Sequence, residues 1–72
     1  MKELVLRNEY IKLGQALKAA DLVSDGAEAK MVIQDGKVEV NGITDTRRGR
    51  KLQAGDVVVY SGSELKIIGQ DG

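Results

Sequence analysis

The chain has 72 residues and a formal net charge of zero, with eleven basic and eleven acidic side chains. It contains neither cysteine nor histidine, which excludes disulfides, thiolate or imidazole metal sites and histidine-dependent catalysis. We expect a single domain over residues 1–72 with a small core, no membrane-spanning segment and no signal peptide, and the lack of cysteine agrees with a cytoplasmic protein.

The first elements in the chain are predicted to be a short strand and a helix. The apolar run Leu4–Leu6 indicates the strand. Apolar residues then recur at the i, i+3, i+4, i+7 spacing of a buried helical stripe, at Leu13, Ala16, Leu17 and Ala20. This stripe predicts a first helix from about Lys12 to Leu22.

A second helix is predicted shortly afterwards. Asp25 and Glu28 have the spacing of a capping box, with Asp in place of the usual Ser or Thr, and they mark its start. A second apolar stripe follows at Ala29, Val32 and Ile33. We expect Met31 to pack in the interior and Gly36 to end the helix in a left-handed conformation. About three residues join the two helices, so they must turn back on each other or cross at a steep angle.

After Gly36 the apolar period becomes two, which is typical of half-buried strands. Three strands are predicted, at Val38–Val40, Val57–Tyr60 and Leu65–Ile68. Asn41-Gly42 predicts a type I′ turn from which Ile43 begins a return strand, and Gly55-Asp56 and Ser61–Ser63 predict two further turns. The predicted fold class is therefore α+β, with two short N-terminal helices packed on a small, mostly antiparallel sheet.

The connection after Ile43 carries four cations in five residues, Arg47, Arg48, Arg50 and Lys51, around Gly49. Like charges on one short connection repel each other, and a polyanion would relieve that repulsion. Arginine can donate two hydrogen bonds to one phosphate, and Gly49 lets the backbone approach a ligand closely. The pattern predicts nucleic acid as the partner. The alternative is a solvated loop that only aids solubility.

Two motifs resemble those of a known family. The run Ile33–Gly42, with Gly before an alternating strand that ends in Val-Asn-Gly, and the later Gly55–Val58 resemble the ribosomal protein S-four RNA-binding domain, the alpha-L motif. The resemblance covers about residues 11–60, the core of the motif. The short length and the segment Arg47–Leu52 resemble the stand-alone YaaA/YbcJ-like branch. The resemblance implies binding of structured RNA, ribosomal RNA ahead of transfer RNA, without catalysis, cofactor, metal or small-molecule substrate.

We expect the RNA contacts to come from the basic connection and from the helices, at Arg47, Arg48, Arg50, Lys51, Lys30, Lys12 and Lys18. Lys30 matches a basic position of the family, whereas Lys12 and Gly26 stand where the family usually carries Arg. The chain has only two aromatic residues, Tyr10 and Tyr60, so recognition should depend on shape and backbone more than on base stacking.

A protein-interaction or adaptor module, on the ribosome or elsewhere, is the alternative function. Dedicated nucleic-acid binders are usually basic overall, and eleven acidic side chains could form an opposite face for a protein partner. A single basic face that joins Lys30 to Arg47–Lys51 would favour RNA, whereas interspersed charge would favour the adaptor. No group of carboxylate, lysine, serine and tyrosine residues in the sequence resembles a catalytic site.

Overall fold

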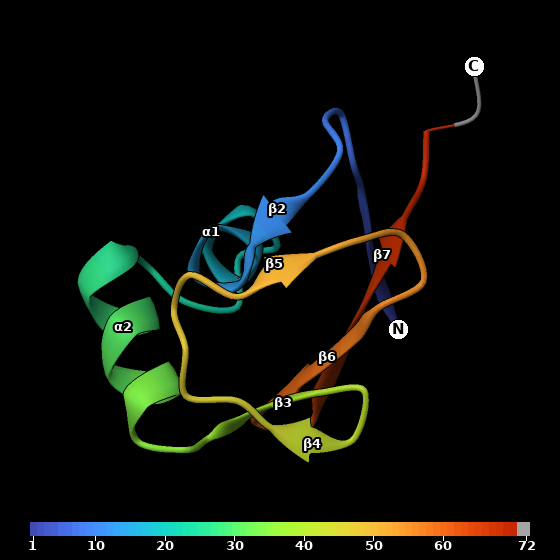
Figure 1. Cartoon of the computed structure of the whole chain (residues 1–72). Coiled ribbons are helices and arrows are strands. Elements are labelled where there is room, and N and C mark those ends of the chain that lie inside the picture. The colour runs from blue at the N-terminus through green and yellow to red at the C-terminus, as the bar shows by residue number, and fades with distance from the viewer. Residues whose placement is uncertain (71–72) are drawn as a thin grey trace.

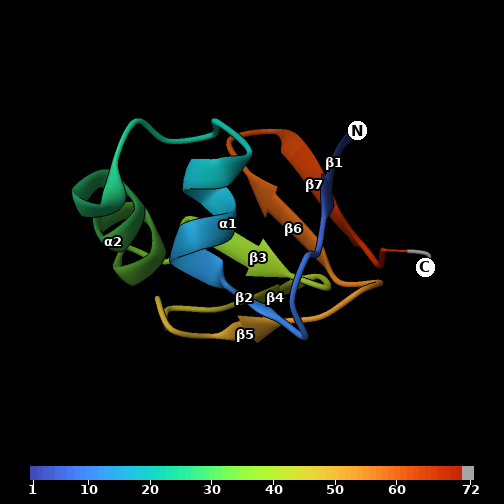
Figure 2. The ribbon, with the colours of Figure 1, turned by 90° about the horizontal axis from the view of Figure 1, so that it is seen from above.

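Two helices lie on the same side of a five-stranded sheet in the computed structural model, which describes residues 1–70 (Figure 1 and Figure 2). In chain order the elements are β1 Lys2–Val5, β2 Ile11–Lys12, α1 Leu13–Ala19, α2 Gly26–Gln34, β3 Val38–Val40, β4 Ile43–Thr44, β5 Lys51–Leu52, β6 Val57–Tyr60 and β7 Ser63–Ile68. Neither helix among these residues is long and apolar enough to cross a membrane.

The sheet confirms the predicted α+β class. Its strand order is β1-β7-β6-β3-β4, and every pair is antiparallel except β1 with β7, which run parallel. The short strands β2 and β5 form a separate antiparallel pair, in which Ile11 lies opposite Leu52. The first strand begins and ends earlier than the predicted Leu4–Leu6, although Leu6 is buried just after it. The last strand begins at Ser63, which the sequence analysis placed in the preceding turn.

The predicted turn at Asn41-Gly42 is confirmed, and it is tied to the turn at Asp56. Asn41 and Gly42 have φ angles of 54° and 83°, both in the left-handed region that a type I′ turn requires. The Asn41 side chain donates to Asp56 Oδ1 at 3.0 Å and accepts from the backbone N–H of Val57 at 2.9 Å. Asp56 Oδ2 accepts in turn from Gln53 N at 2.7 Å. The two sequence motifs are therefore one hydrogen-bonded unit.

Helix α1 ends earlier than the predicted Leu22. Asp21 adopts a left-handed φ of 63°, and its N–H donates to the carbonyl oxygen of Lys18 at 3.0 Å. The N–H of Leu22 donates to the carbonyl oxygen of Leu17 at 2.9 Å. These two bonds form a Schellman motif, which reverses the chain after Ala20. Sequence spacing missed this end because Asp, unlike Gly, is not the usual residue at the left-handed position.

Helix α2 begins and ends where the sequence predicted. Asp25 Oδ1 accepts from the N–H of Glu28 at 2.8 Å, which caps the helix, while the Glu28 side chain accepts from Ser24 N rather than from Asp25 N. Gly36, with φ of 75°, completes a Schellman motif at the other end, and the N–H of Lys37 donates to Val32 O at 3.1 Å. The cap and the left-handed glycine therefore define the two ends of α2.

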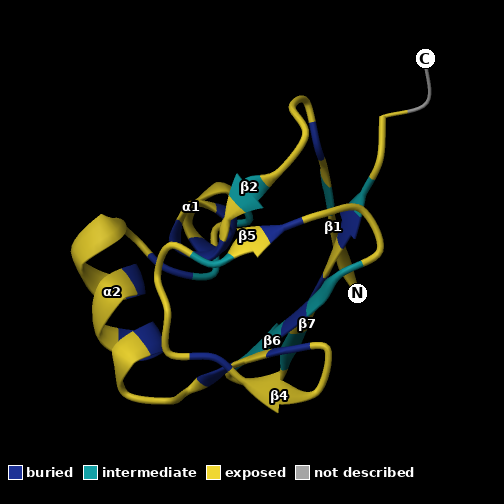
Figure 3. Cartoon of the chain, in the orientation of Figure 1, coloured by how far each residue is buried: buried dark blue, intermediate teal, exposed yellow. Residues whose placement is uncertain are grey.

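The core lies between the helices and the sheet. Its largest fully buried side chains are Leu13, Leu17, Ile33, Leu52, Leu65, Ile67, Val38, Val40 and Val58. Figure 3 shows the inner face of α2 buried and its outer face exposed. Met31 lies on the outer face and is 64% exposed, so the expectation that it packs in the interior is wrong. Met31 lies between Ala29 and Val32 in sequence, but the helical period of about 3.6 residues turns it away from the buried stripe that they form.

Candidate nucleic-acid interface

The basic connection is bound to the start of α1 through backbone hydrogen bonds. The N–H of Leu13 donates to the carbonyl oxygen of Arg50 at 2.8 Å, and the N–H of Gly14 donates to that of Arg48 at 3.1 Å. The first N–H groups of a helix have no partner within the helix, so these carbonyl groups satisfy two of them. The connection, residues 46–50, is therefore held against α1 at two points, and we call it the basic loop.

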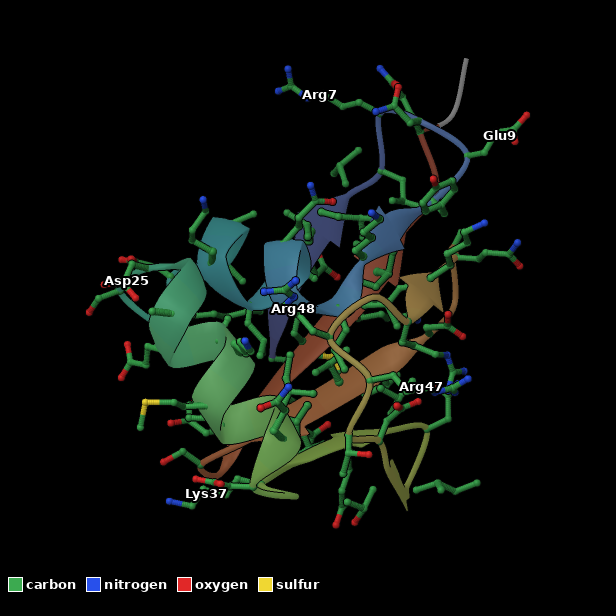
Figure 4. The ribbon with its side chains drawn as sticks, turned by 60° about the vertical axis from the view of Figure 1, so that its left-hand side comes forward. Arg7, Glu9, Asp25, Lys37, Arg47 and Arg48 are labelled. Atoms are coloured by element: carbon green, nitrogen blue, oxygen red, sulfur yellow. The ribbon has the colours of Figure 1, made fainter. Side chains whose placement is uncertain are left out.

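Gly14 lets the side chain of Arg48 lie across the first turn of α1. A Cβ atom at position 14 would lie 2.8 Å from Arg48 Cγ, closer than real Cβ atoms approach any neighbour. Gly14 is buried, and Figure 4 shows Arg48 in front of α1 beside α2. The glycine, which weakens a helix by about 1 kcal/mol relative to alanine, has a packing reason here. It makes room for Arg48.

A cavity of about 320 Å³ lies between α1, the start of α2 and the basic loop. Its lining residues are Lys12, Gly14, Gln15, Lys18, Gly26, Ala29, Arg48 and Gly49. Three of them are cations and none is an acid. A Cβ atom at Gly26 or Gly49 would meet nothing within 4 Å, so the backbone is open to a ligand at both positions. We call this cavity the α1–α2 groove.

Asp45, which the sequence analysis did not single out, binds two of the predicted cations. It is 7% exposed, and its carboxylate accepts from Arg47 N, Nε and Nη2 at 2.9, 3.1 and 2.9 Å and from Arg50 Nη1 at 2.7 Å. The hydrogen bonds from the Arg47 side chain do most to hold the pKa of Asp45 well below its usual range, and the same pairing raises the pKa of Arg47.

A local signal for Asp45 exists in the sequence. The N–H of Arg47 donates to Asp45 Oδ1. An Asp side chain that accepts from the N–H two residues later forms an Asx-turn, for which Asp is one of the preferred residues. Asp45 also follows the predicted turn at Asn41-Gly42 and the return strand that begins at Ile43. The carboxylate was therefore readable as a turn residue, although its second partner, Arg50, was not.

The remaining predicted site residues are divided between different surfaces. Arg47, Gly49, Arg50 and Lys51 line a second hollow, and the Lys51 ammonium lies 4.9 Å from the centre of the Tyr10 ring. Figure 4 shows Arg47 and Arg48 lying on opposite sides of the basic loop. Lys30 is exposed on α2 but does not line the α1–α2 groove. The structure therefore brings Lys12, Lys18 and Arg48 together in the groove and places Arg47 and Arg50 outside its lining. Lys51 also lies outside the lining, but it is the cross-strand partner of Lys12 in the β2–β5 pair.

The described residues contain no group of three or more carboxylates that could hold a metal ion. The polar lining of the groove consists of cations and one amide side chain, Gln15, whose Oε1 accepts from Lys12 N at 3.4 Å. Ammonium and guanidinium groups cannot ligate a cation, but they donate well to phosphate oxygens. The chemistry of the groove is therefore that of an anion site.

The chain is similar to known proteins whose names refer to the ribosome or to transfer RNA. The chain is 50% identical over 54 residues to a Bacillus subtilis (strain 168) protein named probable ribosome maturation protein RlbA, a match over 75% of this chain and 76% of that one. It is 40% identical over 59 residues to the tyrosine–tRNA ligase of Burkholderia lata, but the match spans only 14% of that enzyme.

The comparison with solved structures extends over nearly the whole fold. The solution structure of YbcJ from Escherichia coli, described as revealing an alpha-L motif involved in RNA binding, superposes with a TM-score of 0.74 and 30% identity. It covers 94% of this chain and 87% of YbcJ. The sequence model of the S4 domain matches residues 4–68, from β1 to the end of β7. The chain belongs to the S4 domain family.

Proposed function

We propose that this protein is a small, non-catalytic domain that binds structured RNA through the α1–α2 groove. The observation that carries the proposal is the convergence of Lys12, Lys18 and Arg48 on one cavity without an acid in its lining. Cations so arranged bind phosphate, and open glycine backbone lets a sugar–phosphate chain approach closely. Shape and backbone contacts of this kind are how proteins recognise folded RNA.

Family membership supports RNA as the polyanion. The solved relative is described as having a motif involved in RNA binding, and the Bacillus subtilis relative bears the name of a ribosome maturation protein. We therefore propose ribosomal RNA as the first target, transfer RNA as the second, and the cytoplasm as the place of action. Residues 1–72 would act as one RNA-binding domain. Lys30 and the cations outside the groove lining, Arg47, Arg50 and Lys51, would extend the contact beyond the groove.

The test is binding to purified ribosomal RNA and transfer RNA over a salt series. The groove variant is Lys12→Gln/Lys18→Gln/Arg48→Gln, and the matched control is Arg7→Gln/Lys37→Gln/Lys66→Gln, which removes the same charge from exposed positions outside the groove lining. Figure 4 shows Arg7 and Lys37 far from Arg48. Each lost phosphate contact should reduce the salt slope of the binding constant by roughly 0.7–0.9.

The groove variant should thus lose a slope of roughly 2–3 together with most of its affinity, while the control changes little. Equal losses in the two variants would show that binding depends on total charge and not on this groove. If wild-type protein binds neither RNA at low salt, the RNA-binding function is wrong for this domain, and a protein-interaction module becomes the function to test.

A further inference from the structure

We infer that Asp45 is a positioning residue of the α1–α2 groove and acts through Arg48. This inference rests on the proposed function, because it assigns how the groove obtains one of its three cations. Asp45 does not line the groove itself. It is the only charged or polar residue among the buried side chains of the described chain, and the residues that it binds are Arg47 and Arg50.

The partners of Asp45 belong to the turn that carries Arg48. Arg47 and Arg50 flank Arg48, and a backbone bond of 3.1 Å from Arg50 N to Arg47 O closes the turn between them. Asp45 accepts four hydrogen bonds from the two arginines, one from backbone and three from guanidinium groups. The turn that carries Arg48 is therefore fixed at both ends by one buried carboxylate.

This turn is bound to the start of α1. The carbonyl oxygens of Arg48 and Arg50 accept the N–H groups of Gly14 and Leu13. These bonds require the turn to keep its shape, and they set Arg48 directly over Gly14, where its Cγ occupies the space that a Cβ would need. Asp45 thus orders the backbone, the backbone locates Arg48, and Arg48 completes the groove with Lys12 and Lys18.

The negative charge of Asp45 lets positioning be distinguished from bulk electrostatics, because the two predict opposite changes in RNA affinity when that charge is removed. Asp45 cancels one of the two positive charges of Arg47 and Arg50. Replacing it with asparagine makes the protein more positive, so bulk electrostatics predicts tighter binding to RNA. Positioning predicts weaker binding. Asparagine has one neutral oxygen acceptor in place of two charged ones, so it cannot accept all the hydrogen bonds from the two guanidinium groups, and the turn would lose its shape.

The experiment compares Asp45→Asn with Asp35→Asn, a control of equal charge change at the exposed C-cap of α2. Binding to ribosomal RNA should weaken about tenfold in Asp45→Asn, the size of a lost hydrogen bond to a charged group, and should strengthen slightly or stay constant in Asp35→Asn. Tighter or unchanged binding by Asp45→Asn, with wild type still binding RNA, would overturn the inference and leave the proposed function standing.

A double-mutant cycle separates this role from a general loss of stability. If Asp45 acts through Arg48, Asp45→Asn should weaken binding much less in an Arg48→Gln background than in wild type. Equal fold-changes in both backgrounds would contradict the inference. A purely structural defect would lower binding by the same factor in both, since the fraction of folded protein does not depend on Arg48 contacting RNA.

Amide hydrogen exchange provides a readout that needs no RNA. Asp45→Asn should speed exchange of the Gly14 and Leu13 amides by about tenfold or more, and leave Ile67 N, which bonds Asp56 O at 2.9 Å in the sheet, close to its wild-type rate. Unchanged exchange at Gly14 would overturn the inference even if RNA binding proved absent.

A second variant decides the matter if Asp45→Asn does not fold. Arg47→Lys keeps the net charge and the backbone bond to Asp45 but loses the paired guanidinium–carboxylate geometry. It should weaken RNA binding and speed Gly14 exchange in the same direction as Asp45→Asn. Wild-type values for both measurements would contradict a positioning role for Asp45.

Discussion

The N–H of Gly14 donates to the carbonyl oxygen of Arg48 at 3.1 Å, so the start of α1 and the middle of the basic loop form one unit. The two residues are far apart in sequence, but both the backbone and the side chain of Arg48 lie against Gly14. A Cβ at Gly14 would lie 2.8 Å from Arg48 Cγ. A helix-weakening residue and a cation are thus paired, and the position of one determines the position of the other.

Gly14→Ala should separate RNA binding from stability. Alanine favours the helix by about 1 kcal/mol, but its Cβ must displace Arg48 at Cγ, near the backbone, where the side chain has little freedom to move. We expect a free energy of unfolding within about 1 kcal/mol of wild type and RNA binding weakened several-fold. Urea denaturation and RNA titration on the same samples measure the two quantities.

Gly26→Ala tests the open glycine backbone of the groove without moving Arg48. Its added Cβ would meet nothing within 4 Å, and Gly26 is the first residue of α2. The substitution should leave Arg48 in place and raise the free energy of unfolding by up to about 1 kcal/mol. RNA binding should weaken, because the added methyl group stands where the ligand approaches the backbone. Wild-type RNA binding by Gly26→Ala would contradict close approach at this glycine.

Asn41→Gly should destabilise the fold without affecting the groove. Glycine keeps the left-handed φ of the turn but loses the side-chain bonds to Asp56 and Val57, which should cost about 1–2 kcal/mol. Asn41→Ala loses the same bonds and adds the strain of a left-handed alanine, about 1 kcal/mol more. Thermal or urea unfolding should rank the three proteins wild type, glycine, alanine. An alanine variant as stable as the glycine variant would contradict the conformational part of this account.

The Asp45 carboxylate should contribute to stability with a defined pH dependence. Hydrogen bonds from Arg47 and Arg50 depress its pKa in the folded state below the ordinary value of 3.8. A depressed pKa stabilises the fold above the unfolded-state pKa, and that stabilisation is lost as pH falls toward the folded-state pKa. The stability difference between wild type and Asp45→Asn should thus be constant from about pH 7 to pH 5 and should shrink between about pH 4 and pH 2.

Urea denaturation of the two proteins at several pH values measures this difference directly, because the other carboxylates titrate in both. A difference that stays constant down to about pH 2 would mean that the Asp45 carboxylate is not paired in the folded protein.

The elements of the fold were largely predictable because their signals are local. The capping pattern at Asp25, the left-handed glycine at Gly36 and the type I′ pair Asn41-Gly42 each act within a few residues, and each was found where predicted. The end of α1 was misplaced because Asp21 takes the left-handed position that Gly usually fills. The exposure of Met31 was missed because its helical spacing from Ala27 suggested a packed position, whereas both residues lie off the buried stripe of α2.

The division of the site was not predictable in the same way. Four cations in five residues look like one cluster in the sequence, but their directions depend on a carboxylate outside the run and on a helix start more than thirty residues earlier. Lys12 and Lys18 were named as separate helical cations. Only the packing of α1 against α2 and the basic loop brings them to Arg48. Long-range contacts of this kind leave no periodic signal in the chain.

The most direct test of the RNA-binding groove is a residue-by-residue map of contact. A short RNA hairpin from ribosomal RNA would be titrated into isotope-labelled protein while backbone amide shifts are recorded by NMR. We predict that the largest shifts fall on the groove residues Gly14, Lys18, Gly26, Arg48 and Gly49. Shifts concentrated on the outer strands β1 and β4, with the groove amides unmoved, would contradict the account.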